Sequence, residues 1–166
     1  ERTAAQDVAF GLRQLTDVTA KALSPGINDP TTAIHALGHA SALLSELVDR
    51  DLGPRLLGDD DGDSRIRVVL HRPSFADLLD LAVAQPRRYG AADPAVLARL
   101  FQLLREAAWN ATVQDQRRCI AEQLERCRVT TDAQPFDDAD RAHLNRLADQ
   151  VVEALAGRSP HPRGSQ

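Results

Sequence analysis

Apolar residues recur every three or four positions through most of this chain. That spacing places side chains on one face of a helix, so the pattern predicts amphipathic helices rather than strands. The predicted helices cover residues 3–23, 29–49, about 74–88, 93–109, 112–128 and 137–156. We therefore expect a mainly α fold of about six helices.

Residues that end and start helices separate the first two segments. Pro25 and Gly26 end the first predicted helix, and Asp29 and Pro30 begin the second. An aspartate cap accepts hydrogen bonds from the free amides of a first helical turn, and a proline that follows it has no amide to leave unpaired. The same Asp-Pro pair at residues 93–94 predicts the start of a later helix.

One segment breaks the helical spacing and leaves room for one short strand. Residues 65–70 (Arg-Ile-Arg-Val-Val-Leu) alternate before turning apolar, and their β-branched side chains favour a strand. Because a strand needs a partner for its backbone amides, we expect it to stand alone or to pair with a segment outside this chain. The preceding loop carries an acidic run at residues 59–63 that lacks the spacing of a calcium-binding loop.

Two helix–turn–helix units share a pattern. Each has a phenylalanine near the start of its first helix, then the spacing Gly-x-x-Asp-Pro, then a second amphipathic helix. The units cover about residues 3–49 and 74–109, and their Asp-Pro pairs are offset by 64 residues. We expect two pseudo-repeated hairpins related by a pseudo-twofold axis. The alternative is convergence of two unrelated turns on common capping chemistry.

The turn of the first unit holds the candidate ligand-binding residues. Its polar side chains lie beside a helix N-terminus, where free amides and the helix dipole suit an anion or a polar ligand group. In the functional interpretation, Arg13 or Asp17, an i,i+4 pair on the preceding helix, folds onto the turn and fixes Asn28. The structural alternative is a rigid capped turn beside a surface ion pair. The candidates are Ser24, Asn28, Asp29, Thr31, Arg13 and Asp17.

His35 and His39 are weak candidates for metal ligands. They lie four residues apart on one predicted helix, so they share a face. No third ligand is specified nearby, and Ala36 stands where the H-E-x-x-H motif requires glutamate. We therefore expect no metal and no cofactor.

Composition narrows the class of protein. The length of 166 residues suits a single helical domain over residues 1–156 and a flexible tail at 157–166. The net charge of −4 argues against a bulk nucleic-acid binder. No apolar run approaches the roughly 20 residues that span a bilayer, so we expect this portion to be soluble. The absence of methionine is expected for a domain that comes from a longer chain.

Two blocks of the chain resemble a bacterial predicted membrane protein family, domain of unknown function 2254. The first comprises residues 10–15 (Phe-Gly-Leu-Arg-Gln-Leu) and 22–33 (Ala-Leu-Ser-Pro-Gly-Ile-Asn-Asp-Pro-Thr-Thr-Ala). The second comprises residues 72–75 (Arg-Pro-Ser-Phe) and 93–96 (Asp-Pro-Ala-Val). The resemblance implies a larger parent with an N-terminal transmembrane bundle and this soluble portion after it. It carries over no catalytic role, and the two histidines depart from the family's pattern.

These observations favour a non-enzymatic function. We expect a cytoplasmic accessory or sensory domain of an integral membrane protein, which mediates self-association or ligand-responsive coupling to its membrane bundle. Its expected partners are its own N-terminal transmembrane region and a second copy in a homo-oligomer. The alternative is a hydrolase or transferase with its site at the turn of residues 24–29, which predicts a pocket there and none at the second Asp-Pro turn.

Overall fold

All six predicted helices are present in the computed structural model, which describes residues 4–48, 50, 52–58, 66–70 and 72–157. The acidic run at 59–63 and residues 158–166 of the predicted tail lie outside the described residues. Within the described ranges the elements are, in chain order, α1 (Ala4–Ala22), α2 (Pro30–Leu47), β1 (Arg55–Gly58), β2 (Ile66–Leu70), α3 (Phe75–Tyr89), α4 (Pro94–Asn110), α5 (Gln114–Asp132) and α6 (Asp138–Leu155). The prediction of a mainly α fold is therefore confirmed.

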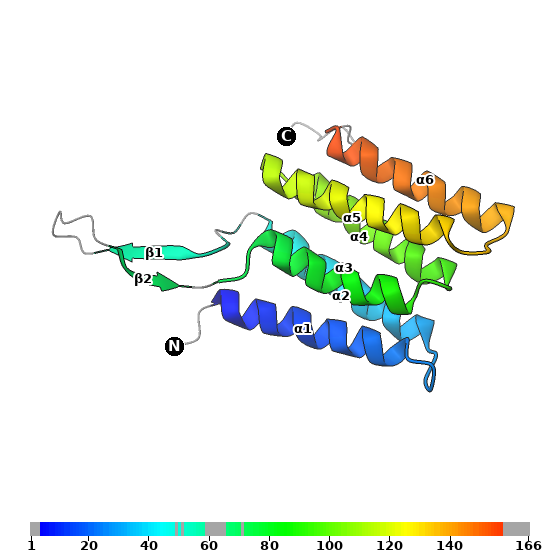
Figure 1. Cartoon of the computed structure of the whole chain (residues 1–166), viewed down its shortest axis with the longest axis horizontal. Helices are drawn as coiled ribbons and strands as arrows, with labels where there is room; N and C mark the ends of the chain where they lie inside the picture. Colours follow the sequence, from blue (N-terminus) through cyan, green and yellow to red (C-terminus); the bar gives the residue numbers. More distant parts are fainter. Residues whose placement is uncertain (1–3, 49, 51, 59–65, 71, 158–166) are drawn as a thin grey trace, which may run out of the picture.

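The helices form two layers. Helices α1, α3 and α5 pack side by side in one layer, and α2, α4 and α6 pack side by side in the other (Figure 1). Consecutive helices run in opposite directions. As a result, the turns that follow α1, α3 and α5 lie at one end of the molecule, which we call the turn end. The start of α1, the end of α6 and both strands lie towards the opposite end, which we call the hairpin end.

The strand prediction was wrong about the partner. Strand β2 pairs in antiparallel register with β1, so that Leu56 stands opposite Val69 and Leu57 opposite Val68. The partner therefore belongs to this chain and is not a missing neighbour. Strand β1 was not predicted from the sequence, because its four residues show no alternation of polar and apolar side chains and end in glycine.

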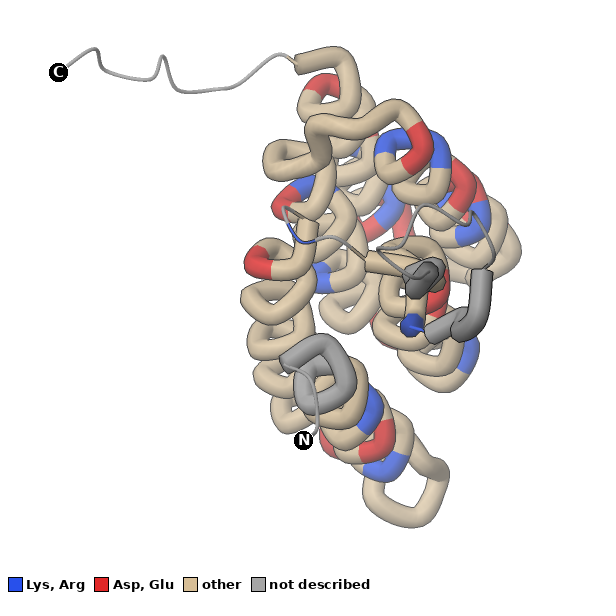
Figure 2. The backbone as a smooth tube through the Cα atoms, turned by 90° about the vertical axis from the view of Figure 1, so that its left-hand side faces the viewer, with Lys and Arg blue, Asp and Glu red and all other residues tan. Residues whose placement is uncertain are grey.

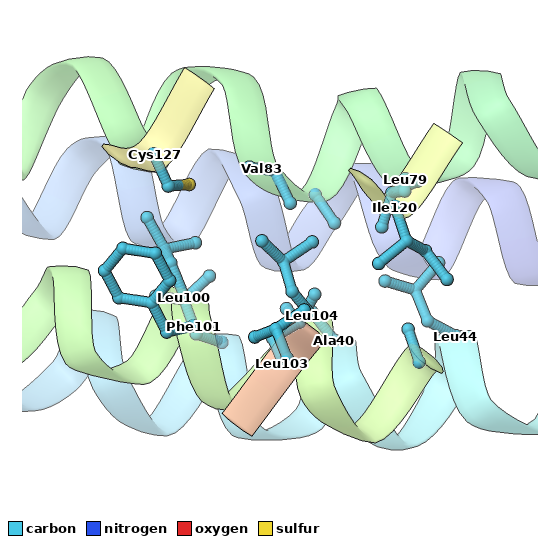
Figure 3. Close-up of a cluster of buried hydrophobic side chains, with 14 of the residues drawn as sticks. Ala40, Leu44, Leu79, Val83, Leu100, Phe101, Leu103, Leu104, Ile120 and Cys127 are labelled. Atoms are coloured by element: carbon cyan, nitrogen blue, oxygen red, sulfur yellow. The ribbon is translucent and has the colours of Figure 1, made fainter. Parts of the chain in front are cut away.

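A single apolar core joins the helices. The buried apolar side chains form one cluster with members from all six described helices. Helix α4 lies at its centre, since it packs against α2, α3, α5 and α6. Figure 3 shows part of this cluster, with labelled side chains from α2 to α5: Ala40, Leu44, Leu79, Val83, Leu100, Phe101, Leu103, Leu104, Ile120 and Cys127. Most are leucine, valine or alanine, which matches the low aromatic content of 4%.

The two predicted repeat units are not packed alike. Helices α1 and α2 are close neighbours, whereas α3 and α4 make much weaker contact with each other. Each unit does begin its second helix with an Asp-Pro cap, as the sequence predicts. The internal repeat stays a prediction.

Candidate functional site

The turn between α1 and α2 is closed by its own backbone. The amides of Ile27 and Asn28 donate hydrogen bonds to the Ser24 carbonyl at 3.0 and 2.9 Å. The amide of Asp29 donates to the carbonyl of Ala22 at 2.8 Å. These bonds occupy polar backbone groups that a ligand would otherwise find available, so recognition in this turn depends on side chains.

The Asp29 carboxylate caps α2 with both of its oxygens. Oδ1 accepts from the Thr32 amide at 3.0 Å, and Oδ2 accepts from the Thr32 hydroxyl at 2.5 Å. The hydroxyl bond is the largest cause that holds the pKa of Asp29 below its ordinary value, and the backbone of Thr31 acts in the same direction. The carboxylate is thus charged at neutral pH and engaged in capping, which disfavours an anion here.

Asn28 occupies the left-handed region of backbone space, with φ of 49°. It is the single non-glycine residue with positive φ in the part of the chain that the structure describes. Asparagine tolerates this region better than most residues, which gives its presence a structural reason. Its side chain is exposed. The amide group is therefore accessible to a ligand.

Ser24 has no activating base among the described residues. Its hydroxyl donates to the carbonyl of Lys21 at 2.7 Å. A serine nucleophile needs a histidine or carboxylate within hydrogen-bond reach to take its proton. The turn therefore contains polar groups that can bind a ligand, without a nucleophile and base arranged as a pair.

Arg13 and Asp17 lie on α1 away from the turn. Both are exposed, and among the described side chains no ion pair joins them and no hydrogen bond joins either to Asn28. At 1.5 Å per residue, Arg13 stands about 14 Å along the helix axis from the end of α1. The structure thus groups Ser24, Asn28 and Asp29 in one turn without bringing the two α1 residues onto it.

The two histidines of α2 face solvent. His35 and His39 are both exposed on successive turns of the helix. No group of three or more histidine, cysteine, aspartate or glutamate side chains suited to a metal ion occurs within the residues described. The histidine pair therefore lacks a converging third ligand in this part of the chain.

The second Asp-Pro turn has a different construction. Asp93 Oδ1 accepts from the amides of Ala95 and Val96 at 2.8 and 3.1 Å, so the capping function matches that of the first turn. Gly90 is buried, and a Cβ atom there would lie 2.4 Å from Val96 Cγ1. A Cβ atom added at the equivalent Gly26 would meet no atom within 4 Å apart from those of its chain neighbours. The two glycines that define the repeat pattern thus meet different constraints.

A shallow groove of about 360 Å³ lies beside the second turn. It is formed between α2, α4 and α6, and it is lined by Ile34, Pro94, Ala95, Ala98, Arg99, Gln102, Asp140 and His143. The enzymatic alternative predicted no pocket at this turn. Residues 90–93 of the turn do not line the groove, so this part of the alternative stays a prediction. The groove is formed by tertiary packing, because its lining comes from three helices that are distant in sequence.

A polar cluster between α2 and α4 was missed from the sequence. The Arg99 guanidinium donates to both oxygens of Glu106, at 3.0 and 3.2 Å, and the Ser41 hydroxyl donates to the same carboxylate. Burial raises the pKa of Glu106, but the hydrogen bonds from Arg99 and Ser41 outweigh it and hold that pKa below its ordinary value. The spacing of seven residues on α4 was the only available signal for the pair. We interpret the cluster as a link between the two helices.

Across the described residues, no helix combines the length and the apolar character that crossing a bilayer requires.

Comparison with known proteins places the chain near bacterial relatives. The family described as Predicted membrane protein (DUF2254) matches residues 1–106. Uncharacterized proteins of Mycobacterium bovis and of two strains of Mycobacterium tuberculosis are 41% identical over 157 residues. Each alignment covers 93% of this chain and 29% of the relative, so the chain spans less than a third of the length of these relatives. No solved structure shows significant similarity.

Proposed function

Because the chain belongs to the family described as Predicted membrane protein (DUF2254), we propose that it is an accessory domain of a bacterial integral membrane protein. In this proposal the domain lies on the cytoplasmic side and couples self-association or ligand binding to a membrane bundle elsewhere in the polypeptide. The observation that carries the proposal is the match to relatives of which the chain covers 29%. In a protein of that length, the part outside this domain is large enough to contain the membrane bundle.

The helices offer a route for coupling between the two ends of the domain. Each of α1, α2 and α6 has 18 or 19 residues, so it extends about 28 Å. All three pack into one apolar core, and close-packed cores transmit displacement because they have little free volume. In the proposal, a ligand bound at the turn end shifts helices whose other ends lie at the hairpin end.

The ligand site in this proposal is the first turn. Its available side-chain groups are the exposed amide of Asn28 and the exposed hydroxyl of Thr31. The charged Asp29 carboxylate beside them favours a neutral or cationic polar ligand group over an anion. Arg13 and Asp17 would contribute to this site through a ligand long enough to extend from the turn along α1.

Thermal-shift screening tests the ligand part of the proposal. The chain is screened against cations, nucleosides and small polar metabolites, with Asn28→Gly as the site variant, because glycine keeps the positive φ and removes the amide. A compound that raises the Tm of the wild type and not of Asn28→Gly supports a site in the turn. A compound that stabilises both proteins equally binds elsewhere, which contradicts this site.

Light scattering after size exclusion tests the self-association part. The expected result is a mass that rises with protein concentration towards that of a dimer. A strict monomer at every concentration contradicts self-association by this domain alone. The ligand part of the proposal is unaffected by that result, because the two readouts are independent.

A further inference from the structure

The β-hairpin formed by β1 and β2 stands apart from the helices. Within the described residues neither strand packs against any of the six helices, and the two strands contact only each other. Figure 1 shows the hairpin extending beyond the helical layers at the hairpin end. Its base is tied to the domain, since the Gly53 amide donates to the Pro73 carbonyl at 3.1 Å and Arg72 Nε donates to the Gly53 carbonyl at 3.2 Å.

A hairpin of this kind is poorly suited to stand alone in water. Its strands have four and five residues, and two-stranded ribbons without a packing layer are marginally stable. Six of these nine residues are leucine, isoleucine or valine. In the described part of the chain the sheet has two strands, so the outer edge of each can accept a further strand. Both the composition and the open edges indicate a partner.

Two exposed apolar side chains lie at the same end of the domain as the hairpin. Trp109 in the last turn of α4 is 38% exposed, and Val113 just before α5 is 53% exposed. The indole ring is held under the guanidinium of Arg105, whose central carbon lies 4.8 Å from the ring centroid. A fixed, partly exposed tryptophan is a typical anchor in protein interfaces. The hairpin and these two side chains thus lie at the same end of the domain.

We propose that the hairpin end docks onto the rest of the same polypeptide, and that an extended segment from that region adds to the hairpin as a third strand. This inference rests on the proposed function. More than two-thirds of each relative's length lies outside the match, so a covalently linked partner is present at high effective concentration. An open edge is satisfied at low entropic cost by a segment that is already tethered.

The charge pattern favours this protein partner over an anionic lipid surface. Polybasic segments are what anionic headgroups attract, and this chain has a net charge of −4. Figure 2 views the molecule from the hairpin end and shows acidic and basic positions mixed over the helices. The two strands carry two charged residues, Arg55 and Arg67, which is fewer than the basic clusters that bind anionic headgroups. An apolar or backbone-mediated contact therefore suits this end better.

Hydrogen exchange of the β1 and β2 amides tests the docking. The full-length protein in detergent is compared with the isolated chain at low and high concentration, and with the isolated chain beside phosphatidylglycerol vesicles. We expect the strand amides to exchange at least about 100-fold more slowly in the full-length protein than in the isolated chain under every condition. Equal exchange in the two proteins overturns the proposal.

The other two arms identify different occupants. Protection that appears in the isolated chain only at high concentration assigns the hairpin to a second copy, and protection that appears only with vesicles assigns it to lipid. Either result overturns docking onto the same polypeptide. Flotation of the full-length protein with membranes is scored separately. A protein that floats with an unprotected hairpin refutes the docking alone, whereas one that fails to float with a protected hairpin refutes the proposed function alone.

A hairpin replacement provides the matched variant. A short Gly-Ser linker replaces residues 55–71, which is geometrically feasible because Gly53 and Pro73 are joined by a backbone hydrogen bond. Since no described helix touches the hairpin, the isolated variant should keep the Tm of the wild-type chain within about 2 °C. In the full-length protein, the variant should increase exchange at Trp109 and Val113. Unchanged exchange there contradicts a docked hairpin end.

Discussion

Substitution of Gly90 by alanine gives the sharpest test of the packing at the second turn. The added Cβ would lie 2.4 Å from Val96 Cγ1 and 3.0 Å from the Pro86 carbonyl oxygen. Carbon atoms in contact prefer about 3.5–4.0 Å, so Val96 must move by roughly 1 Å. Val96 and Pro86 are both buried, and the surrounding core leaves little room for that movement. Overpacking of this kind costs about 1–3 kcal/mol, and we expect about 2 kcal/mol for Gly90→Ala.

Gly26→Ala is the matched control at the first turn. Gly26 is exposed, lacks a positive φ, and has no heavy atom, apart from those of its chain neighbours, within 4 Å of the position that an added methyl group would take. The change should therefore alter the free energy of unfolding by less than about 0.5 kcal/mol, or stabilise slightly by restricting the unfolded chain. Urea unfolding followed by circular dichroism measures both variants under the same conditions.

A double-mutant cycle separates steric clash from other causes. Val96→Ala removes the atom that Gly90→Ala would meet, so the two changes should be less than additive by at least about 0.5 kcal/mol. Two outcomes would refute the reasoning. One is a Gly90→Ala protein as stable as Gly26→Ala, and the other is strict additivity in the cycle.

The polar cluster, the second helix cap and the two thiols each give a further prediction. The pKa of Glu106 is held below its ordinary value of 4.5, so the stability that its charged form contributes is complete above pH 4.5. That contribution is lost as the pH falls through the lower pKa of the folded state. In urea unfolding measured at several pH values, Glu106→Gln should reduce this loss of stability at acid pH. Asp93→Ala should cost about 1 kcal/mol of unfolding free energy by the same assay, through loss of a helix cap. In maleimide labelling at pH 7, Cys119 should react well before Cys127, because Cys127 is fully buried and burial raises its pKa to about 12. Equal labelling rates would contradict the described burial.

The helices and their starts could be predicted because they depend on local chemistry. Asp29 and Asp93 cap their helices as the sequence indicates, since a cap is formed by residues within one turn. The residue with left-handed backbone geometry was harder to predict. Glycine favours a positive φ, which makes Gly26 the expected residue in this turn, yet Asn28 adopts it. Local pattern thus identified the turn and left its internal geometry open.

Contacts between segments that are distant in sequence could not be predicted from local residue patterns. The ion pair of Arg99 with Glu106 spans two helical turns and is completed by Ser41 from another helix. The partner of β2 was missed for the same reason, since a short strand is defined by what it pairs with. For the candidate site, the sequence brought together the residues of one turn, while the placement of Arg13 along α1 required the folded chain.

Protease access to the full-length protein in membrane vesicles tests the central claim most directly. Inverted vesicles and intact cells are treated with trypsin, and the released peptides are identified by mass spectrometry. The account predicts that the protein sediments with the membranes and that peptides from residues 72–157 are released from inverted vesicles alone. A protein found in the supernatant before digestion, or cleaved in this region from outside intact cells, would contradict a cytoplasmic accessory domain of a membrane protein.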